Sequence, residues 1–562
     1  MVGAGFVRRR MDAAPSADHI AQRVVIVGGG TAGWMAAAAL ARFAPASTRI
    51  TLIESDAIGT VGVGEATIPG IRLFNQMLGL DEAEFLRATN GSFKLGIRFE
   101  GWSGEGSGYL HAFGSIGRGL GLVPFHHYWL RGGGAASPAS LWGHMPSAQA
   151  AMAGRFAPDP GRSDLPSGLA WAYHFDASLY AALLRRHAEA AGVVRVEGRI
   201  ASVARDTGGR IDHVVLDGGQ AHAGDLFIDC TGFRALLIGE TLAEPFDDWS
   251  DLLPCDRALA VAGERTSPLP PYTRAIAHGA GWRWRIPLQH RTGNGLVYDS
   301  RHLSEDEAAD RLLTALNGEA KGEPRRLCFT TGRRRRAWVG NCVALGLAAG
   351  FLEPLESTSI HLIQSGIARL LDYWPGTIPP AVEIDAYNRE TAAEWLAIRD
   401  FLILHYHANA RPEPFWIERR AVPLPESLAA RIALFRANGR FRREGEELFA
   451  EPAWVQVMIG QGIIPAGHHA LADALSADEL DDFLSLTRRH AAQVAARLPT
   501  YDAFLAAHCA APAPKVLHEE AAARAPRDRH AARRTGLPPA PAAGRGDLFR
   551  PARPIREWRH RQ

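Results

Sequence analysis

The chain has 562 residues, of which 47% are hydrophobic and 22% are charged, with a net charge of +2. This is ordinary globular composition, with length for about two to four domains. Residues 511–562 hold twelve Lys/Arg and five Asp/Glu, a net of +7, so the remaining residues carry −5. The body of the chain therefore gives no charge argument for nucleic-acid binding.

The cysteines and the apolar runs limit the cellular setting. The five cysteines are odd in number, and no two have C-x-x-C spacing. This favours a reduced, cytoplasmic protein without a metal centre. The first residues are charged but lack the apolar run of a signal peptide, and glycines interrupt the most apolar stretches. We expect no membrane partner.

In chain order, the first strong signal is a βαβ unit. A short β-branched run is followed by GGGTAG, an Ala/Leu-rich helical run and a second strand. Later β-branched and apolar runs also predict strands. The last of them, residues 341–347, is predicted to be a buried strand or a passage from strand to helix. The predicted strands are Arg23–Val27, Arg49–Glu54, His213–Leu216, Leu226–Cys230 and Asn341–Leu347.

The remaining pattern divides the chain into four parts. Residues 1–22 are expected to be a disordered extension, and 23–380 a nucleotide-binding module with inserted segments. Residues 381–510 have a helical pattern and form the second module. Residues 511–562 are rich in Ala, Pro and Arg, and are expected to be a disordered basic tail.

The glycine loop predicts a dinucleotide site. Gly28 allows a tight turn, Gly30 lets the backbone approach a pyrophosphate, and Gly33 lets helix and strand pack closely. Thr31 and Ala32 open the helix, whose N-terminus favours phosphate. Glu54 ends the second strand, where a carboxylate accepts hydrogen bonds from ribose hydroxyls. The pattern alone does not separate FAD from NAD.

Several further segments carry a family resemblance. They are VGVGEATIPGI, GSFKLGIRFEGW, FHHYWLR, WAYHFDASL, LFIDCTGFRALLI, GWRWRIP and GLAAGFLEPLESTSIHLIQ. In this order, over roughly residues 23 to 505, the chain resembles the flavin-dependent tryptophan halogenase family. The W-x-W-x-I-P and F-x-x-P-x-x-S strings are specific to that group.

The resemblance implies a fold and a set of partners. The fold is α/β, an FAD-binding Rossmann-like module of the GR2 flavoprotein monooxygenase type with a mostly helical substrate module. A separate flavin reductase supplies FADH2, and the substrate is a small aromatic molecule. The oligomeric state, a homodimer included, is left open.

The resemblance also implies the chemistry. Reduced FAD, oxygen and a halide ion give hypohalous acid, which moves to a lysine beside the substrate. The matching lysine is Lys94, and the matching carboxylate, which accepts the ring proton, is Glu356. Taken alone, Lys94 would be read as a solvated strand residue and Glu356 as a surface or capping carboxylate.

The resemblance also implies roles for two pairs of residues. Trp282 and Trp284 lie two apart, so on a strand they share a face. They are core aromatics or a barrier between substrate and flavin, and the two readings are compatible. The halide site matches Thr358 and Ser359, where serine replaces the family's glycine. We hypothesise that the added Cβ alters halide preference, toward bromide.

Other flavin contacts are implied at two loops. Gly62, Gly64, Glu65 and Ala66 match the family's second flavin-contacting loop, and Leu347 matches a third region.

The substrate segment departs from the family. Residues 441–465 lack the Tyr-Tyr pair of the tryptophan-specific members and look shortened. Phe449 and Trp454 could wall an aromatic pocket, whereas Glu446 and Glu447 are read as solvated. An indole without the amino-acid group, a phenol, a pyrrole or a larger aromatic metabolite therefore fits better than free tryptophan.

Two alternatives stay open. A flavin-dependent aromatic hydroxylase would share the glycine loop but bind NAD(P)H itself. A flavin-binding protein without halogenase activity would explain the serine at position 359 and the altered substrate segment. The histidines show no H-E-x-x-H or comparable spacing, so no metal is expected.

Overall fold

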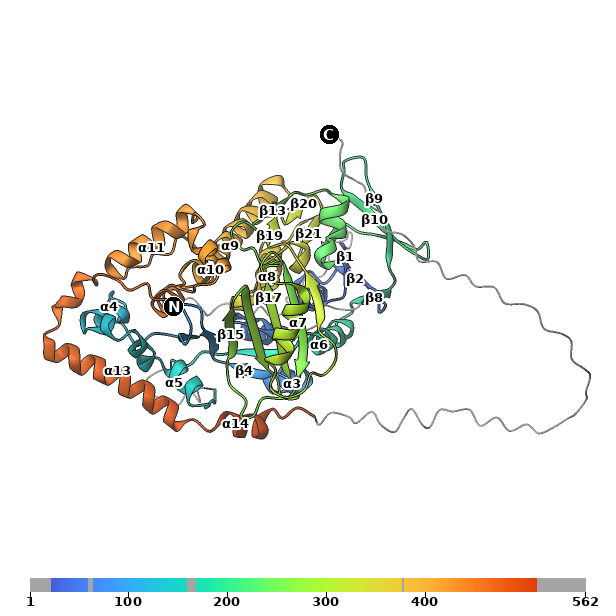
Figure 1. The fold of residues 1–562 in the computed structure, drawn as a ribbon. Helices are drawn as coiled ribbons and strands as arrows, with labels where there is room; N and C mark the ends of the chain where they lie inside the picture. Colours follow the sequence, from blue (N-terminus) through green and yellow to red (C-terminus); the bar gives the residue numbers. More distant parts are fainter. Residues whose placement is uncertain (1–21, 59–63, 159–167, 377–378, 513–562) are drawn as a thin grey trace, which may run out of the picture. The chain divides into compact units, whose positions relative to one another are not determined.

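The computed structural model describes residues 22–512, except 59–63, 159–167 and 377–378 (Figure 1). The predicted disordered segments 1–22 and 511–562 therefore lie outside the described residues, apart from 22, 511 and 512. The described residues form one compact unit. The division at residue 380 stays a prediction.

A six-stranded sheet forms the first layer. Its centre is β1, whose apolar residues are buried and pair in parallel with β2 and β12. β-branched residues buried on both faces are typical of such a strand. The order is β20 (Trp338–Val339), β21 (Cys342–Ala344), β12 (Leu226–Asp229), β1 (Arg23–Val27), β2 (Arg49–Glu54) and β8 (Val194–Glu197). The predicted strands are confirmed, and β21 passes into the turn η5 (Gly346–Ala348).

The helix after β1 explains the glycine loop. α1 (Thr31–Phe43) is buried from Gly33 to Leu40, as expected of a helix that is apolar all round. It packs against α6 (Ala177–Ala190) and α8 (Ser359–Asp372). Its N-terminus lies at the carboxyl end of β1, the edge of a parallel sheet where ligands bind.

A seven-stranded sheet forms the second layer. Neighbouring strands are antiparallel except β15 and β5. Trp282 and Trp284 lie on one face of its β16, as predicted, and both are buried. The order is β18 (Arg325–Cys328), β14 (Arg257–Gly263), β17 (Thr292–Tyr298), β16 (Gly281–Pro287), β15 (Thr273–His278), β5 (Gly96–Glu100) and β6 (Gly108–Ala112).

Three small sheets complete the strands described. The first links the second flavin loop to Lys94 and consists of β3 (Gly64–Ala66), β7 (Ala172–Asp176) and β4 (Ser92–Lys94). The second consists of β11 (Ala221–Ala223), β10 (Ile211–Leu216) and β9 (Ile200–Arg205). The third consists of β13 (Phe246–Asp248), β19 (Gly332–Arg334) and β22 (Gly350–Phe351).

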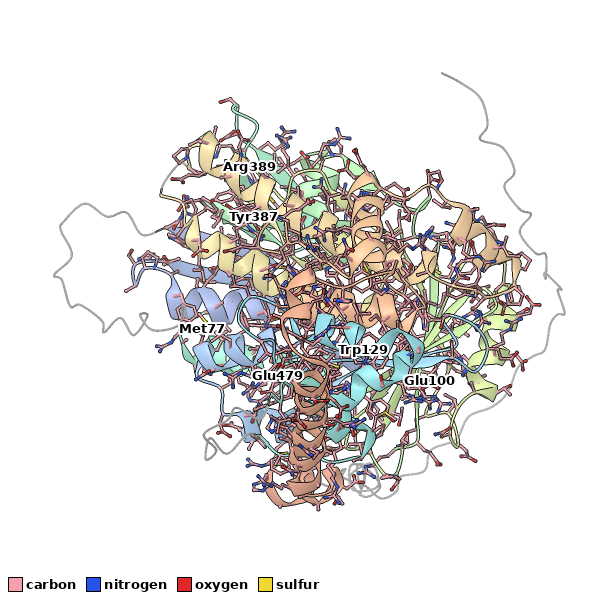
Figure 2. The ribbon with its side chains drawn as sticks, turned by 90° about the vertical axis from the view of Figure 1, so that its left-hand side faces the viewer. Met77, Glu100, Trp129, Tyr387, Arg389 and Glu479 are labelled. Atoms are coloured by element: carbon pink, nitrogen blue, oxygen red, sulfur yellow. The ribbon has the colours of Figure 1, made fainter. Side chains whose placement is uncertain are left out.

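Helices dominate the described chain after residue 380, as predicted. Figure 1 shows α13 running beside α4 and α5, and α13 begins with a capping box between Ser476 and Glu479. On α9, Tyr387 is buried against Trp338 while Arg389 is exposed (Figure 2). The later helices are α9 (Ala381–His407), α10 (Pro414–Ala421), α11 (Glu426–Asn438), α12 (Glu451–Gly460), α13 (Ala477–Arg497) and α14 (Tyr501–His508).

Shorter helices and turns fill the first part of the chain. The helices are α2 (Gly70–Leu78), α3 (Glu82–Ala88), α4 (Phe125–Arg131), α5 (Pro146–Met152) and α7 (Glu305–Thr314). The short 3-10 helices are η1 (Gly134–Ala136), η2 (Pro138–His144), η3 (Gly232–Arg234), η6 (Pro354–Glu356) and, in the later helical part, η7 (Ala470–Ala474). The element η4 (Leu236–Thr241) is a π-helix.

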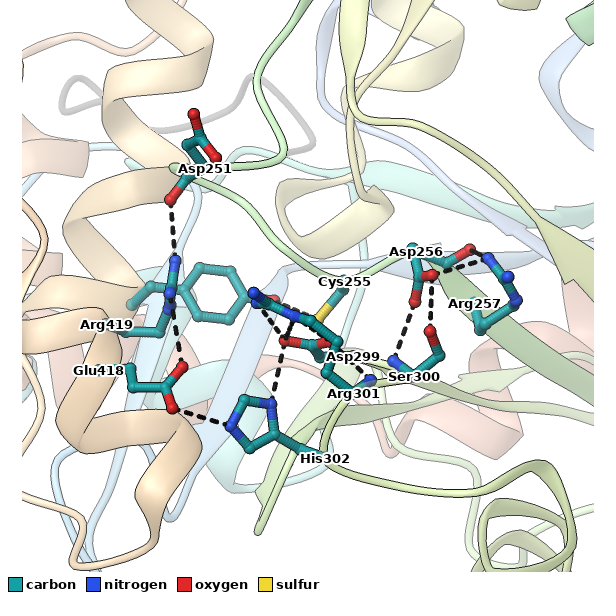
Figure 3. Close-up of polar contacts among 11 residues, drawn as sticks. Asp251, Cys255, Asp256, Arg257, Asp299, Ser300, Arg301, His302, Glu418 and Arg419 are labelled. Carbon is teal, nitrogen blue, oxygen red and sulfur yellow. Dashed lines mark hydrogen bonds and ion pairs between the residues drawn. The ribbon is translucent and has the colours of Figure 1, made fainter. Parts of the chain in front are cut away.

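Polar contacts tie α10 to the seven-stranded sheet (Figure 3). Asp299, just after β17, has a side chain only 1% exposed and accepts hydrogen bonds from Arg301. Its Oδ2 contacts His302 Nδ1, and His302 Nε2 contacts Glu418 of α10 at 3.2 Å. This network holds the helical part against the sheet that carries the tryptophan pair.

Candidate functional site

One cavity of about 530 Å³ gathers most of the predicted cofactor residues. It lies at the carboxyl end of β1, and segments far apart in the sequence line it. Among its lining residues are Gly28, Gly30, Thr31, Ala32, Glu54, Gly64, Glu65, Ala66 and Leu347. Trp284, Ser357 and Ser359 also line it. Gly62 lies outside the described residues.

The glycines of the loop show why side chains are excluded there. Gly28 has φ +107°, and a Cβ on it would lie 2.2 Å from the Cys230 carbonyl oxygen. A Cβ on Gly33 would lie 1.9 Å from the Gly28 carbonyl oxygen. A Cβ on Gly30 would meet no atom within 4 Å, so that face opens toward the cavity. These positions fit a bound pyrophosphate at the α1 N-terminus.

Glu54 is oriented by an arginine that sequence reasoning missed. Arg195 Nε donates to Glu54 Oε1 at 2.7 Å, and both side chains are 15% exposed. Glu54 Oε2 lies beside Gly29, where a Cβ would come within 1.5 Å of it. Because Arg195 holds one oxygen, the other is positioned to accept from a ribose hydroxyl.

Glu65 brings a second carboxylate to the cavity, from β3. Burial raises its pKa to about 7. An uncharged carboxylic acid here could donate a hydrogen bond to a ring system in the cavity.

Lys94 is fully buried, which excludes the solvated interpretation. It ends β4, and its Nζ donates to Ser357 Oγ at 2.7 Å. The same Nζ lies 5.4 Å from the centre of the Phe113 ring. Burial lowers the pKa of Lys94 to about 7, although Glu356 acts in the opposite direction. Both the amine and the ammonium are therefore accessible near neutral pH.

Glu356 is likewise buried, at 1% exposure, so it is no surface carboxylate. It ends the turn η6, between two histidines. His111 Nδ1 lies 3.0 and 2.9 Å from its two oxygens, and His405 Nε2 lies 2.8 Å from Oε1. Burial acts to raise the pKa of Glu356, but the two histidines outweigh it and lower that pKa to about 2.

Sequence reasoning missed three residues of this site: His111, Phe113 and His405. His111 lies in β6 and Phe113 directly follows that strand, so an H-x-F pattern was the available signal for the pair. His405 belongs to α9 and had no local signal, because its contact with Glu356 spans 49 residues of sequence.

The tryptophan pair forms a buried wall, with ring centroids 6.0 Å apart. Trp282 Nε1 donates to Glu353 Oε2 at 2.8 Å, and Tyr406 Oη donates to the same oxygen at 2.5 Å. Burial raises the pKa of Glu353 to about 7, because these hydrogen bonds only partly offset it. Glu353 thereby fixes the Trp282 indole, while Trp284 faces the cavity.

Thr358 and Ser359 lie at the start of α8, as an anion site requires. Ser359 is the first residue of the helix, and such a position has no intrahelical partner for its N–H. Thr358 is fully buried, and its Oγ1 has no hydrogen-bond partner among the described residues. The positive φ, +60°, falls at Ser357 and not at Ser359. Serine in place of glycine at 359 is therefore free of the anticipated backbone strain.

Phe449 and Trp454 join an aromatic cluster beside Glu356. Phe449 stacks on Phe401 at 3.9 Å and lies 6.3 Å from the His111 ring. Trp454 packs edge-on against Phe401, with ring centroids 4.8 Å apart, and is 1% exposed.

The interpretation of Glu447 as solvated is wrong. Its side chain is 9% exposed and accepts hydrogen bonds from both terminal nitrogens of Arg431, on α11. The bidentate pair offsets the cost of burying the carboxylate. Glu446 is exposed, as predicted.

One group of potential metal ligands comes together within the described ranges: His126, His127 and Glu451. His126 Nε2 donates to the Gly439 carbonyl at 2.7 Å. The His469 N–H donates to His127 Nδ1, so neutral His127 carries its proton on Nε2. The three residues thus do not offer three lone pairs at once, and the expectation of no metal stays a prediction.

Residues 23–477 match the family model described as tryptophan halogenase. Tryptophan 7-halogenase RebH of Lentzea aerocolonigenes is 34% identical over 522 residues, covering 86% of this chain and 98% of the relative.

Two solved structures are similar over nearly their whole length. Xcc4156, a flavin-dependent halogenase from Xanthomonas campestris, is 50% identical with a TM-score of 0.85, covering 88% of this chain and 100% of that chain. BrvH, a flavin-dependent halogenase from Brevundimonas sp. BAL3, is 45% identical with a TM-score of 0.83, covering 86% of this chain and 99% of that chain.

None of the described helices is long and apolar enough to cross a membrane.

Proposed function

This chain belongs to the tryptophan halogenase family, and from that membership we propose how its own residues divide the work of halogenating an electron-rich aromatic ring. It is an FAD-dependent halogenase, an oxidoreductase that uses FADH2, oxygen and halide. The atoms balance as FADH2, O2, halide, one proton and the aromatic substrate giving FAD, aryl halide and two waters. When bound, FADH2 would supply the two electrons that activate oxygen, and the activated oxygen would in turn oxidise the halide.

The cavity residues are proposed to hold that cofactor. Gly28, Gly30 and Gly33 admit the pyrophosphate, with Thr31 and Ala32 at the positive end of α1. Glu54, oriented by Arg195, accepts from the ribose. Gly64, Glu65, Ala66 and Leu347 line the same cavity as Trp284, and the flavin ring would lie against them.

The observation that carries the proposal is the burial of Lys94 and Glu356 around one turn. Lys94 is hydrogen-bonded to Ser357, the residue that follows Glu356. As an ammonium it donates to the oxidised halogen, and as an amine it can carry the halogen itself. Glu356, a carboxylate held by two histidines, stabilises the cationic ring and accepts its proton.

The tryptophan pair and the start of α8 are proposed to keep the flavin, the halide and the substrate in separate places. The Trp282–Trp284 wall, braced by Glu353, separates substrate from flavin, so oxygen is not transferred directly to the ring. The N–H of Ser359 and the unpaired hydroxyl of Thr358 bind the halide.

The aromatic cluster supports an aromatic substrate other than free tryptophan. The Phe449 ring lies near the His111 ring, and Trp454 packs against Phe401. Glu447, which could have met an amino group, is already paired with Arg431. We expect an indole without the amino-acid group, a phenol, a pyrrole or a larger aromatic metabolite.

The proposal includes partners and a cellular setting. A separate flavin reductase supplies diffusible FADH2, and the protein forms a homodimer. The five cysteines are free, which favours the cytoplasm.

The test supplies the protein with a flavin reductase, FAD, NADH and either bromide or chloride. A panel of indoles, phenols and pyrroles is added, and halogenated products are measured by mass spectrometry. We expect aryl halides only when reductase and halide are both present. Hydroxylated products, with NADH oxidised by the protein alone, would instead identify a hydroxylase.

A further inference from the structure

We propose that this protein has a second ligand site, on the face of the seven-stranded sheet opposite the tryptophan pair, and that this site binds a small organic phosphate. A pocket of about 480 Å³ lies there, and Arg98, Arg274 and Arg285 line it. No described residue lines both this pocket and the cofactor cavity. The proposal goes beyond halogenation and does not depend on it.

Strand register brings the three arginines side by side. On β16, Arg285 directly follows Trp284, so its side chain leaves the opposite face of the sheet. Arg285 is paired with Arg274 of β15, and Arg274 is paired with Arg98 of β5. Like charges at paired positions repel and weaken a sheet. Three neighbouring strands therefore carry an unfavourable row of guanidinium groups.

One glutamate compensates only part of this charge. Among the described residues that line the pocket, Glu100 is the one acid. It accepts two hydrogen bonds from Arg274, both at 2.7 Å, and its Oε1 lies 3.4 Å from Arg98 Nε. Three guanidinium groups against one carboxylate leave an excess of two positive charges at the pocket.

The other contacts of these arginines fix them without neutralising them. Arg285 Nη1 donates to the side-chain oxygen of Asn317 at 3.0 Å, and its Nη2 donates to the carbonyl of Ala315. Arg98 Nη1 lies 3.2 Å from the sulfur of Met152. All three partners are uncharged, so the guanidinium groups are held in place while their charge stays exposed to one another.

An anion between the guanidinium groups would relieve their repulsion. Burial lowers the pKa of Arg285, the charges of Arg274 and Arg283 act in the same direction, and Glu100 opposes them only in part. The side chains of Arg98 and Arg274 are each 32% exposed, so a ligand can reach them from solvent. A phosphate monoester carries a charge of about −1.5 to −2 near pH 7, which matches the excess of two. Guanidinium groups also bind phosphate oxygens through paired N–H donors.

The rest of the pocket favours an organic phosphate over the free ion. Tyr272, two residues before Arg274, is half-buried and lines the same pocket. A methionine and three prolines also line it: Met152, Pro268, Pro270 and Pro287. Tyrosine and proline rings offer flat apolar surfaces on which an aromatic group can pack. The expected ligand is therefore a phosphate ester that carries a flat or aromatic group.

The first test is calorimetric titration of phenyl phosphate into the FAD-free protein at constant ionic strength. Arg98→Leu removes one guanidinium and leaves the pair between Arg274 and Glu100 intact. Arg442→Leu is the matched control, because Arg442 is exposed and does not line the pocket. We expect saturable binding to wild type and to Arg442→Leu, and a dissociation constant about tenfold higher or more in Arg98→Leu.

Two results of this titration would overturn the proposal: no saturable binding to wild type, or equal affinity in wild type and Arg98→Leu. Inorganic phosphate is titrated in parallel and should bind more weakly than phenyl phosphate, because it lacks the ring. Equal affinity of the two would show that the apolar part of the pocket contributes nothing, and would refute the assignment to an organic phosphate.

The cofactor loop is a competing phosphate site, so Gly30→Ala is titrated as well. A Cβ on Gly30 meets no protein atom within 4 Å, and it would occupy space on the open side of the loop. We expect Gly30→Ala to bind phenyl phosphate as wild type does. Loss of binding in Gly30→Ala, with binding kept in Arg98→Leu, would assign the phosphate to the cofactor loop and overturn the proposal.

A second measurement needs no variant. Wild-type protein is treated with phenylglyoxal, which modifies accessible arginines, and the modified peptides are quantified by mass spectrometry with and without phenyl phosphate. We expect the phosphate ester to protect Arg98 and Arg285 and to leave the modification of Arg442 unchanged. Unchanged modification of Arg98 and Arg285 at saturating phenyl phosphate would overturn the proposal, whatever the stability of the variants.

Discussion

Replacing Lys94 with methionine should abolish halogenation and yet stabilise the folded protein. Lys94 is fully buried, and burial lowers its pKa from 10.5 to about 7. Each pKa unit corresponds to about 1.4 kcal/mol, so the charged form is disfavoured in the folded state by about 5 kcal/mol. Methionine is similar in length and carries no charge to desolvate.

Part of that gain is offset. Ser357 Oγ loses the donor that Lys94 Nζ provides at 2.7 Å, which costs about 1 to 3 kcal/mol. Glu356 also loses a favourable charge, although His111 and His405 remain beside it. We therefore expect a net increase of about 1 to 4 kcal/mol in the free energy of unfolding near pH 6. Such a gain is expected where a residue is kept for function although it lowers stability.

The stability difference between Lys94→Met and the wild type depends on pH. Below about pH 7 Lys94 is protonated in both the folded and the unfolded state, so the whole penalty is present. As the pH rises from 7 toward 10.5, the folded state releases its proton before the unfolded chain does, and the penalty fades. The penalty falls from about 5 to about 2 kcal/mol, so the advantage of Lys94→Met should shrink by about 3 kcal/mol between about pH 6 and pH 9, which removes most of it.

The assay is thermal or urea unfolding of the FAD-free protein at both pH values. Lys321→Met is the matched control, because Lys321 is exposed; it should show no such pH-dependent gain. If Lys94→Met were less stable than wild type at pH 6, or if its advantage were the same at both pH values, Lys94 would not be a desolvated cation.

Substitutions at three other residues give separate outcomes. Glu356→Gln removes the proton acceptor, so aryl halide formation should fall by about 10²-fold or more while oxidation of reduced FAD continues in the same cuvette. Glu353→Leu leaves the buried Trp282 and Tyr406 donors unpaired and should lower the free energy of unfolding by about 2 to 4 kcal/mol; Glu353→Gln keeps an acceptor oxygen, and an equal loss there would refute the hydrogen-bond explanation. Ser359→Gly should raise the chloride-to-bromide product ratio in a competition with both halides, and an unchanged ratio would show that the side chain at 359 does not set halide preference.

The local parts of the fold could be predicted from the sequence. β1, the glycine loop and α1 follow from a β-branched run, three spaced glycines and an Ala/Leu-rich helix, all of which act over a few residues. The pairing of Trp282 and Trp284 on one face follows from strand periodicity. Lys94 and Glu356 were found through family motifs, because composition alone favours an exposed lysine and an exposed glutamate.

The rest of the site depends on contacts between distant segments. His111 and His405 reach Glu356 across 245 and 49 residues of sequence, from β6 and α9. Glu447 lies in the loop between α11 and α12, and its partner Arg431 lies on α11, 16 residues earlier, outside any local pairing pattern that the sequence could reveal. A buried charge is recognised only once its partner is known.

The central claim is that Lys94 guides the halogen after the cofactor has done its part. The most direct measurement is the amount of aryl halide formed per reduced FAD oxidised, in wild type and in Lys94→Ala, with equal protein, oxygen and bromide. The account predicts equal rates of flavin oxidation and loss of nearly all product in the variant. Halogenation by Lys94→Ala at the wild-type yield and ring position would contradict it.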